Sequence, residues 1–136
     1  MKTWLMPALI TVFLYGLWSF FPKLSVRYLS PSNAVIYEVI GSMVFGAIAI
    51  ALMGFNLQYH PKGAIFGMLT GFCLVLAGFT YLIAASRGPV ALVSSVSALY
   101  PMVTLVLAAL LLGETITIKQ GCGILLAIVS VILMAS

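Results

Sequence analysis

The chain has 136 residues, of which 64% are hydrophobic and 6% are charged. A soluble domain carries about 25% charged residues, so these few side chains cannot cover a surface that faces water. The net charge of +4 does not indicate nucleic-acid binding, because the basic residues stand singly between apolar runs, as they do at the ends of membrane helices. Composition therefore predicts an all-α integral membrane protein.

Five apolar segments follow one another along the chain, and a helix needs about 20 such residues to span a bilayer. We expect helices over residues 5–21, 34–53, 63–85, 90–112 and 120–135. The connections are too short to hold a soluble domain, so we expect residues 1–136 to form a single five-helix transmembrane domain. The first segment has the position of a signal peptide, but bulky residues follow it where cleavage needs small ones, which predicts an uncleaved helix.

The first helix carries two aromatic residues, Tyr15 and Trp18, which are three residues apart and share one face. They are candidates for shaping a pocket. The alternative for Trp18 is the aromatic belt that lines membrane interfaces near helix ends.

The second helix contains Glu38, the only acidic residue inside a predicted span. A carboxylate in hydrocarbon is costly, so such residues usually face protein or water and often mark a transport path. Glu38 is therefore a candidate proton or cation site. It also lies close to the start of its helix, so a structural ion pair with Lys23 or Arg27 is the alternative.

The third helix places Tyr81 near its end and Gly63, Gly67 and Gly71 at four-residue spacing near its start. Small residues on one helix face let another helix approach closely. The sequence leaves open whether this glycine face packs inside one subunit or between subunits.

The fourth helix has a polar stripe at helical spacing, with an aromatic residue beside it. Its members are Ser94, Ser97, Tyr100, Pro101 and Thr104. Pro101 has no N–H to donate to the carbonyl of Ser97, so we expect a kink there. The stripe either lines a path, since irregular backbone at membrane depth borders cavities, or packs against other helices.

Helix direction brings most of the polar and aromatic candidates into one half of the membrane. These residues are Tyr15, Trp18, Glu38, Tyr81, Ser94 and Ser97. The other half is lined by aliphatic side chains. We therefore expect a pocket that opens toward the side on which the first helix ends.

The basic residues are balanced between the two sides of the membrane. Lys2, Lys62 and Lys119 fall on the N-terminal side, and Lys23, Arg27 and Arg87 fall on the other. Orientation normally follows an excess of Lys and Arg in cytoplasmic loops, and here there is none. A partner or the first helix sets one orientation, or copies insert both ways and pair antiparallel, which reproduces the inverted repeats of many secondary transporters.

The residues that enzymes and metal sites need are missing from the sequence. His60 is the only histidine, so no metal cluster and no histidine-activated serine is expected. There is also no glycine-rich phosphate loop with a lysine. We expect no metal, no cofactor and no enzymatic activity.

Several short sequence motifs resemble those of the EamA-type repeat in the drug/metabolite transporter superfamily, and the resemblance covers nearly the whole chain. They are Tyr15 to Lys23 (YGLWSFFPK), the turn Ser86 to Pro89, Tyr100-Pro101, Gly113-Glu114 and Gln120-Gly121. The resemblance implies a five-helix repeat with a cavity between helices. Typical members carry two inverted repeats, so a homodimer or a partner subunit is implied. Many members have a basic residue early in the second helix where this chain has Glu38.

We therefore expect a half-size secondary transporter of small metabolites or drug-like molecules, which works as a dimer and is coupled to protons or cations. Its expected location is the cell membrane, as a multi-pass protein of a prokaryotic inner membrane. The alternative is a membrane scaffold or accessory subunit of a larger complex that transports nothing itself.

Overall fold

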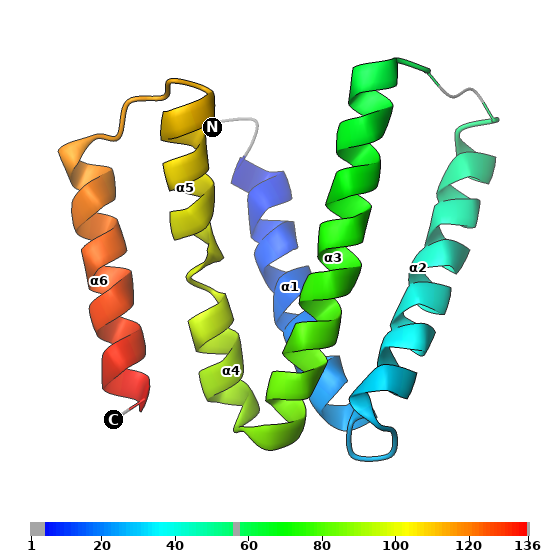
Figure 1. Cartoon of the computed structure of the whole chain (residues 1–136), viewed down its shortest axis with the longest axis horizontal. Coiled ribbons are helices and arrows are strands. Elements are labelled where there is room, and N and C mark those ends of the chain that lie inside the picture. The colour runs from blue at the N-terminus through cyan, green and yellow to red at the C-terminus, as the bar shows by residue number, and fades with distance from the viewer. Residues whose placement is uncertain (1–4, 56–57, 136) are drawn as a thin grey trace. The chain divides into compact units, whose positions relative to one another are not determined.

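The computed structural model describes residues 5–55 and 58–135 and contains only helices within them (Figure 1). The helices are α1 (Leu5–Ser25), α2 (Pro31–Leu52), α3 (Pro61–Arg87), α4 (Val90–Ser97), α5 (Tyr100–Leu111) and α6 (Ile118–Ala135). Within the described ranges, four stretches are long and apolar enough to cross a membrane, and α6 is a shorter apolar helix. The predicted all-α membrane class is confirmed.

The chain divides into two compact units, residues 1–87 and residues 88–136. The first unit holds α1, α2 and α3, and α3 packs against both of the others. Its buried residues are Pro22, Ala34, Gly78, Tyr81, Leu82 and Ala85. All of them lie toward the end of the unit at which α1 ends, α2 begins and α3 ends, so the core of the first unit sits at this end.

The first helix is longer than the sequence predicted. We expected it to stop at Phe21, but α1 continues through Pro22 to Ser25. Pro22 removes one backbone donor, yet its own carbonyl still accepts the N–H of Val26 at 2.9 Å, and its ring is buried in the core. The second helix begins at Pro31, earlier than predicted, because proline fits the first helical turn, where an N–H has no partner. The expected long connection shrinks to residues 26–30.

The second unit shows the interruption that Pro101 predicted. The stretch from Val90 to Leu111 is split into α4 and α5, with a break at Ala98 and Leu99. Pro101 then falls in the first turn of α5, where a missing N–H costs little. In the same unit, α4 packs against α6.

Most large apolar side chains of the described residues face outward. Phe13, Phe66 and Leu126 are 68%, 68% and 69% exposed, for example. In water such surfaces drive association, whereas in a bilayer lipid tails cover them.

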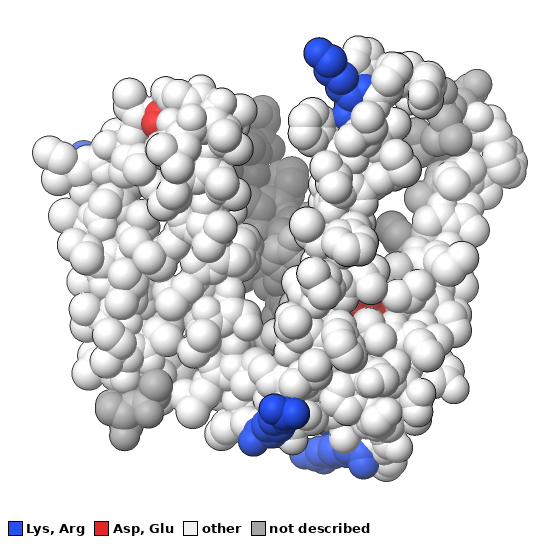
Figure 2. Space-filling model, viewed as in Figure 1, with Lys and Arg blue, Asp and Glu red and all other residues white. Residues whose placement is uncertain are grey.

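The basic residues of the first unit lie at both of its ends (Figure 2). Lys23, Arg27 and Arg87 belong to the end that holds the core, and Lys62 belongs to the first turn of α3 at the other end. Lys2 lies outside the described residues.

Candidate functional site

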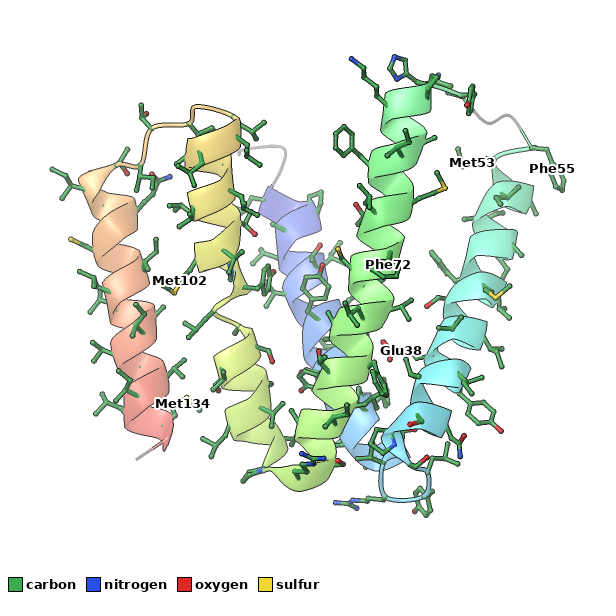
Figure 3. All side chains as sticks on the ribbon, viewed as in Figure 1. Glu38, Met53, Phe55, Phe72, Met102 and Met134 are labelled. Atoms are coloured by element: carbon green, nitrogen blue, oxygen red, sulfur yellow. The ribbon has the colours of Figure 1, made fainter. Side chains whose placement is uncertain are left out.

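The carboxylate of Glu38 is held by a tryptophan from the neighbouring helix. Trp18 on α1 donates its indole Nε1–H to Oε1 of Glu38 at 2.9 Å, and both side chains are partly buried. A hydrogen bond to a charged acceptor is stronger than one between neutral groups. In Figure 3, Glu38 lies between α2 and α3. The predicted candidates Trp18 and Glu38 are therefore in direct contact.

The Glu38 carboxylate packs against Gly78 of α3. A Cβ built on this glycine would lie 2.9 Å from each carboxylate oxygen of Glu38 and 3.1 Å from its Cδ. Real Cβ atoms do not approach other atoms so closely. Only glycine at position 78 leaves room for the observed placement of the carboxylate.

Tyr81 completes the wall of the site and ties α3 to α1. Its ring lies against that of Trp18, with centroids 5.2 Å apart and planes inclined by 43°. Its hydroxyl donates to the backbone carbonyl of Ser19 at 2.7 Å, and the side chain is 6% exposed. Aromatic pairs in this tilted geometry are favourable beyond their buried area. Tyr81 therefore holds the Trp18 ring in position behind the carboxylate.

The described contact of Lys23, one of the two basic residues that the alternative role for Glu38 invoked, is with α3 and not with Glu38. Nζ of Lys23 donates to the backbone carbonyl of Ala85 at 2.7 Å, near the end of α3, where a cation compensates the negative end of the helix dipole. Arg27 lies exposed in the turn after α1. In the described part of the chain, Trp18 is the donor to the Glu38 carboxylate, and Oε2 has no donor.

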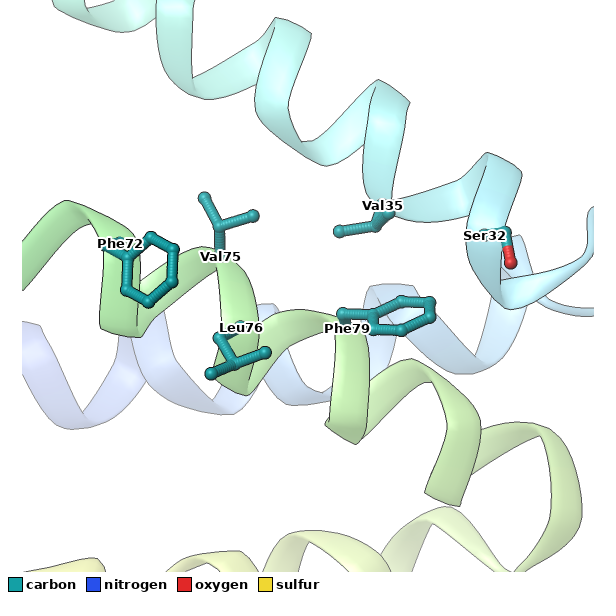
Figure 4. Close-up of a pocket in the computed structure, with 6 residues that line it drawn as sticks. All are labelled: Ser32, Val35, Phe72, Val75, Leu76 and Phe79. Atoms are coloured by element: carbon teal, nitrogen blue, oxygen red, sulfur yellow. The ribbon is translucent and has the colours of Figure 1, made fainter.

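An apolar groove lies between α2 and α3 (Figure 4). It has a volume of about 320 Å³ and is lined by Ser32, Val35, Phe72, Val75, Leu76 and Phe79. Val35 precedes Glu38 by one turn of α2, and Phe79 directly follows Gly78 on α3. The six lining residues include neither Glu38 nor Gly78.

Tyr15, the remaining candidate of the first unit, lies on α1 one turn before Trp18 and is 51% exposed.

The predicted polar stripe belongs to the second unit and is divided by the helix break. Ser94 and Ser97 are in α4, whereas Tyr100, Pro101 and Thr104 are in α5. The hydroxyl of Ser94 donates to the carbonyl of Ala91 at 3.2 Å, and that of Thr104 donates to the carbonyl of Tyr100 at 3.4 Å. Such bonds satisfy a hydroxyl within its own helix.

A cavity of about 220 Å³ in the second unit borders the stripe. Pro101 and Thr104 line it together with Glu114 and Gln120. The last two are among the marks that carried the family resemblance.

Two of those marks have local structural roles. Gly113 has φ +67°, a left-handed conformation that lets the chain turn after α5 and costs other residues about 1–2 kcal/mol. Gln120 forms a capping box with Thr117 at the start of α6. Its Oε1 accepts the N–H of Thr117 at 2.8 Å, and its own N–H donates to Oγ1 of Thr117 at 3.3 Å.

Sequence reasoning missed Gly78 and Ser19. Gly78 follows Gly71 by seven residues and therefore lies on the same face of α3 as the glycine ladder, so the ladder could have been extended to it. Ser19 contributes only its backbone carbonyl, which no side-chain pattern can reveal. Within the described part of the first unit, a Cβ added at Gly67 or Gly71 would meet no atom within 4 Å.

Comparison with known proteins identifies the family to which the chain belongs. The family model described as the EamA-like transporter family matches residues 2–136. An uncharacterized protein of Methanocaldococcus jannaschii is 23% identical over 135 residues, which cover 99% of this chain and 98% of that protein. No solved structure matches the chain.

Proposed function

Because the chain belongs to the EamA-like transporter family, we propose that it is a half-size secondary transporter, which carries small metabolites or drug-like molecules across the cell membrane as a dimer. The family is one of membrane transporters of small molecules, and the apolar helices agree with a multi-pass membrane protein. The substrate, the coupling ion and the dimer belong to the proposal.

The observation that carries the proposal is the placement of Glu38. It is an acidic residue within an apolar span, its Oε1 is held by Trp18, and Oε2 has no donor among the described residues. A carboxylate in this setting can take up a proton or a cation and release it again, which is the chemistry that coupled transport needs.

The other candidate residues receive roles around this carboxylate. Trp18 and Tyr81 form an aromatic wall, and we propose that Tyr15 extends it along α1. The stripe of the second unit, from Ser94 to Thr104, lines the transport path, and the break before Pro101 supplies a hinge. The backbone stays helical in its dihedral angles at Ala98 and Leu99, so the break is a local tightening of the helix at which it can bend.

The dimer follows from the repeat and from the distribution of charge. One five-helix repeat has an odd number of spans, so two antiparallel copies reproduce an inverted repeat. The balance of basic residues between the two sides of the membrane permits both insertions. The relative in Methanocaldococcus jannaschii, which this chain covers almost completely, is likewise of single-repeat length.

Flux into liposomes tests the proposal. The purified chain is reconstituted and screened against metabolites and drug-like compounds, with and without a proton gradient. Glu38→Gln keeps the shape of the side chain and removes its charge, so it should abolish gradient-dependent flux while the protein stays folded. Tyr37→Phe, which removes a polar group next to Glu38 on an exposed face of α2, is the control and should leave flux unchanged.

The oligomeric state separates the transporter from an accessory subunit. A stable homodimer of the chain alone in detergent agrees with the proposal. Obligate co-purification with another membrane protein, together with no flux for any compound, would favour the accessory subunit.

A further inference from the structure

We propose that the cavity of the second unit binds the headgroup of a zwitterionic lipid that carries a primary ammonium, as phosphatidylethanolamine does. The cavity is formed by α5, by the connection that follows it and by Gln120 of α6. The inference goes beyond the proposed function, because it applies equally to a transporter and to an accessory subunit.

The cavity lies at the depth where lipid headgroups surround a membrane protein. The stretch Val90–Leu111 is long and apolar enough to cross a membrane, and Glu114 comes three residues after its end. The connection from α5 to α6 (Figure 1) therefore lies at the membrane surface. Leu105 and Ala108 of α5 line the same cavity, so its wall is apolar toward the hydrocarbon and polar toward the water.

The second unit carries one acidic and one basic side chain, and both lie at this end of the unit. Glu114 and Lys119 are the only charged residues in the sequence from 88 to 136, and neither has an ion-pair partner among the described residues. Glu114 follows the end of α5, where the helix dipole is negative, and Lys119 lies in the first turn of α6, where it is positive. A zwitterionic headgroup offers the two complementary charges.

The lining of the cavity favours a primary ammonium over a quaternary one. Glu114, Thr104 and Thr115 contribute oxygen atoms to it. The Thr115 hydroxyl has no partner among the described residues, and the Thr104 hydroxyl is engaged as a donor, so both oxygens can accept. An ammonium with three N–H groups suits such a set. Quaternary ammonium groups are bound by aromatic faces, and none of the lining residues is aromatic.

The phosphate of the same headgroup then lies outside the cavity, at the start of α6. Helix N-termini bind phosphate through their N–H groups and their dipole, and Lys119 directly precedes Gln120, which lines the cavity. The cavity itself has a volume of about 220 Å³, equal to that of about seven water molecules. This is room for an ammonium and the short carbon chain that carries it, while the acyl chains stay in the bilayer.

The test compares three lipids that share their acyl chains and differ in the headgroup. They are phosphatidylethanolamine, phosphatidylcholine and phosphatidylglycerol. The purified full chain is mixed with equal amounts of the three in detergent, and native mass spectrometry identifies the lipid that stays bound. We expect phosphatidylethanolamine to be retained about 10-fold or more over each of the other two, because they lack the N–H groups that bond to the Glu114 carboxylate.

Variants test each part of the site. Glu114→Gln should remove the preference for phosphatidylethanolamine, and Lys119→Gln should weaken all three lipids alike, since they share the phosphate. Ala108→Leu keeps both charges but fills the cavity, so it should weaken binding of phosphatidylethanolamine about 10-fold. Ala91→Leu makes the same change at an exposed position of α4 that does not line the cavity, and it should leave binding unchanged.

Equal retention of phosphatidylethanolamine and phosphatidylcholine by the unaltered chain would overturn the inference, as would an unchanged preference in a folded Glu114→Gln variant. If thermal unfolding shows that this variant does not fold, Ala108→Leu decides, and unchanged binding there would be equally fatal. Unchanged binding of all three lipids to Lys119→Gln would refute the placement of the phosphate. Phosphoethanolamine, which has no acyl chains, separates a lipid from a soluble amine. Its displacing the bound lipid at an equimolar amount would show that the ligand is not a lipid.

Discussion

Gly78→Ala perturbs the proposed site while preserving every charge and hydrogen-bonding group of the chain. The added Cβ would lie 2.9 Å from both Glu38 oxygens. Ordinary contacts begin at 3.4 Å, so the carboxylate must retreat by about 0.5 Å or more. It is the far end of a flexible side chain, and it can move without shifting the helices.

Two opposing effects set the change in stability. The retreat stretches or breaks the bond from Trp18 Nε1, and a hydrogen bond to a charged group contributes about 1.5–3 kcal/mol. Alanine in a helix interior is favoured over glycine by about 1 kcal/mol. We therefore expect Gly78→Ala to lower the free energy of unfolding by about 0.5–2 kcal/mol, and to reduce flux about 10-fold because the carboxylate leaves its position.

The measurements are thermal unfolding in detergent, Trp18 emission in a Trp4→Phe background, and liposome flux. Gly16→Ala is the matched control, because it lies inside α1 and an added Cβ there meets nothing within 4 Å. It should show the gain in helix propensity alone, with unchanged emission and flux. If Gly78→Ala behaves like Gly16→Ala in all three measurements, the carboxylate does not rest on Gly78 and the geometry argued above is wrong.

Three further changes probe the other parts of the chain. Pro101→Ala should let an N–H reach the carbonyl of Ser97 and straighten the α4–α5 break, so flux should fall while the melting temperature stays equal or rises; a large loss of stability with normal flux would count against a hinge. Thr117→Ala removes one half of the capping box and should cost about 1 kcal/mol in thermal unfolding with little effect on flux, and no loss of stability would show that the cap is dispensable. Two lysines added within residues 26–30, or two within residues 53–60, should each fix one orientation, as reporter fusions at the C-terminus would show. Each of these last variants should be inactive alone and active when co-expressed with the other, and full activity of one alone would refute the antiparallel dimer.

The membrane spans are determined by the sequence alone, and the reason is local. A bilayer offers no partner for backbone polar groups, so each apolar run has to close its hydrogen bonds within its own helix. The interruption at Pro101 and the capping box at Thr117 are equally local, because each depends on residues within one turn. The end of α1 lies beyond the expected Phe21, because the helix continues through Pro22 to Ser25, where the proline ring is buried and its carbonyl still accepts the N–H of Val26.

The contacts within the candidate site, in contrast, depend on the tertiary structure. The sequence singled out Glu38, Trp18 and Tyr81 because acidic and aromatic side chains are rare enough in apolar spans to stand out. Which groups contact the Glu38 carboxylate depends on how far each helix extends and how it is rotated about its axis. In the tertiary structure, Trp18 donates a hydrogen bond to the Glu38 carboxylate. Lys23 instead donates to a backbone carbonyl near the end of α3. The tertiary structure also shows the role of Gly78, which leaves room for the Glu38 carboxylate because it has no side chain. Such a role can be recognised only when the position of the neighbouring side chain is known.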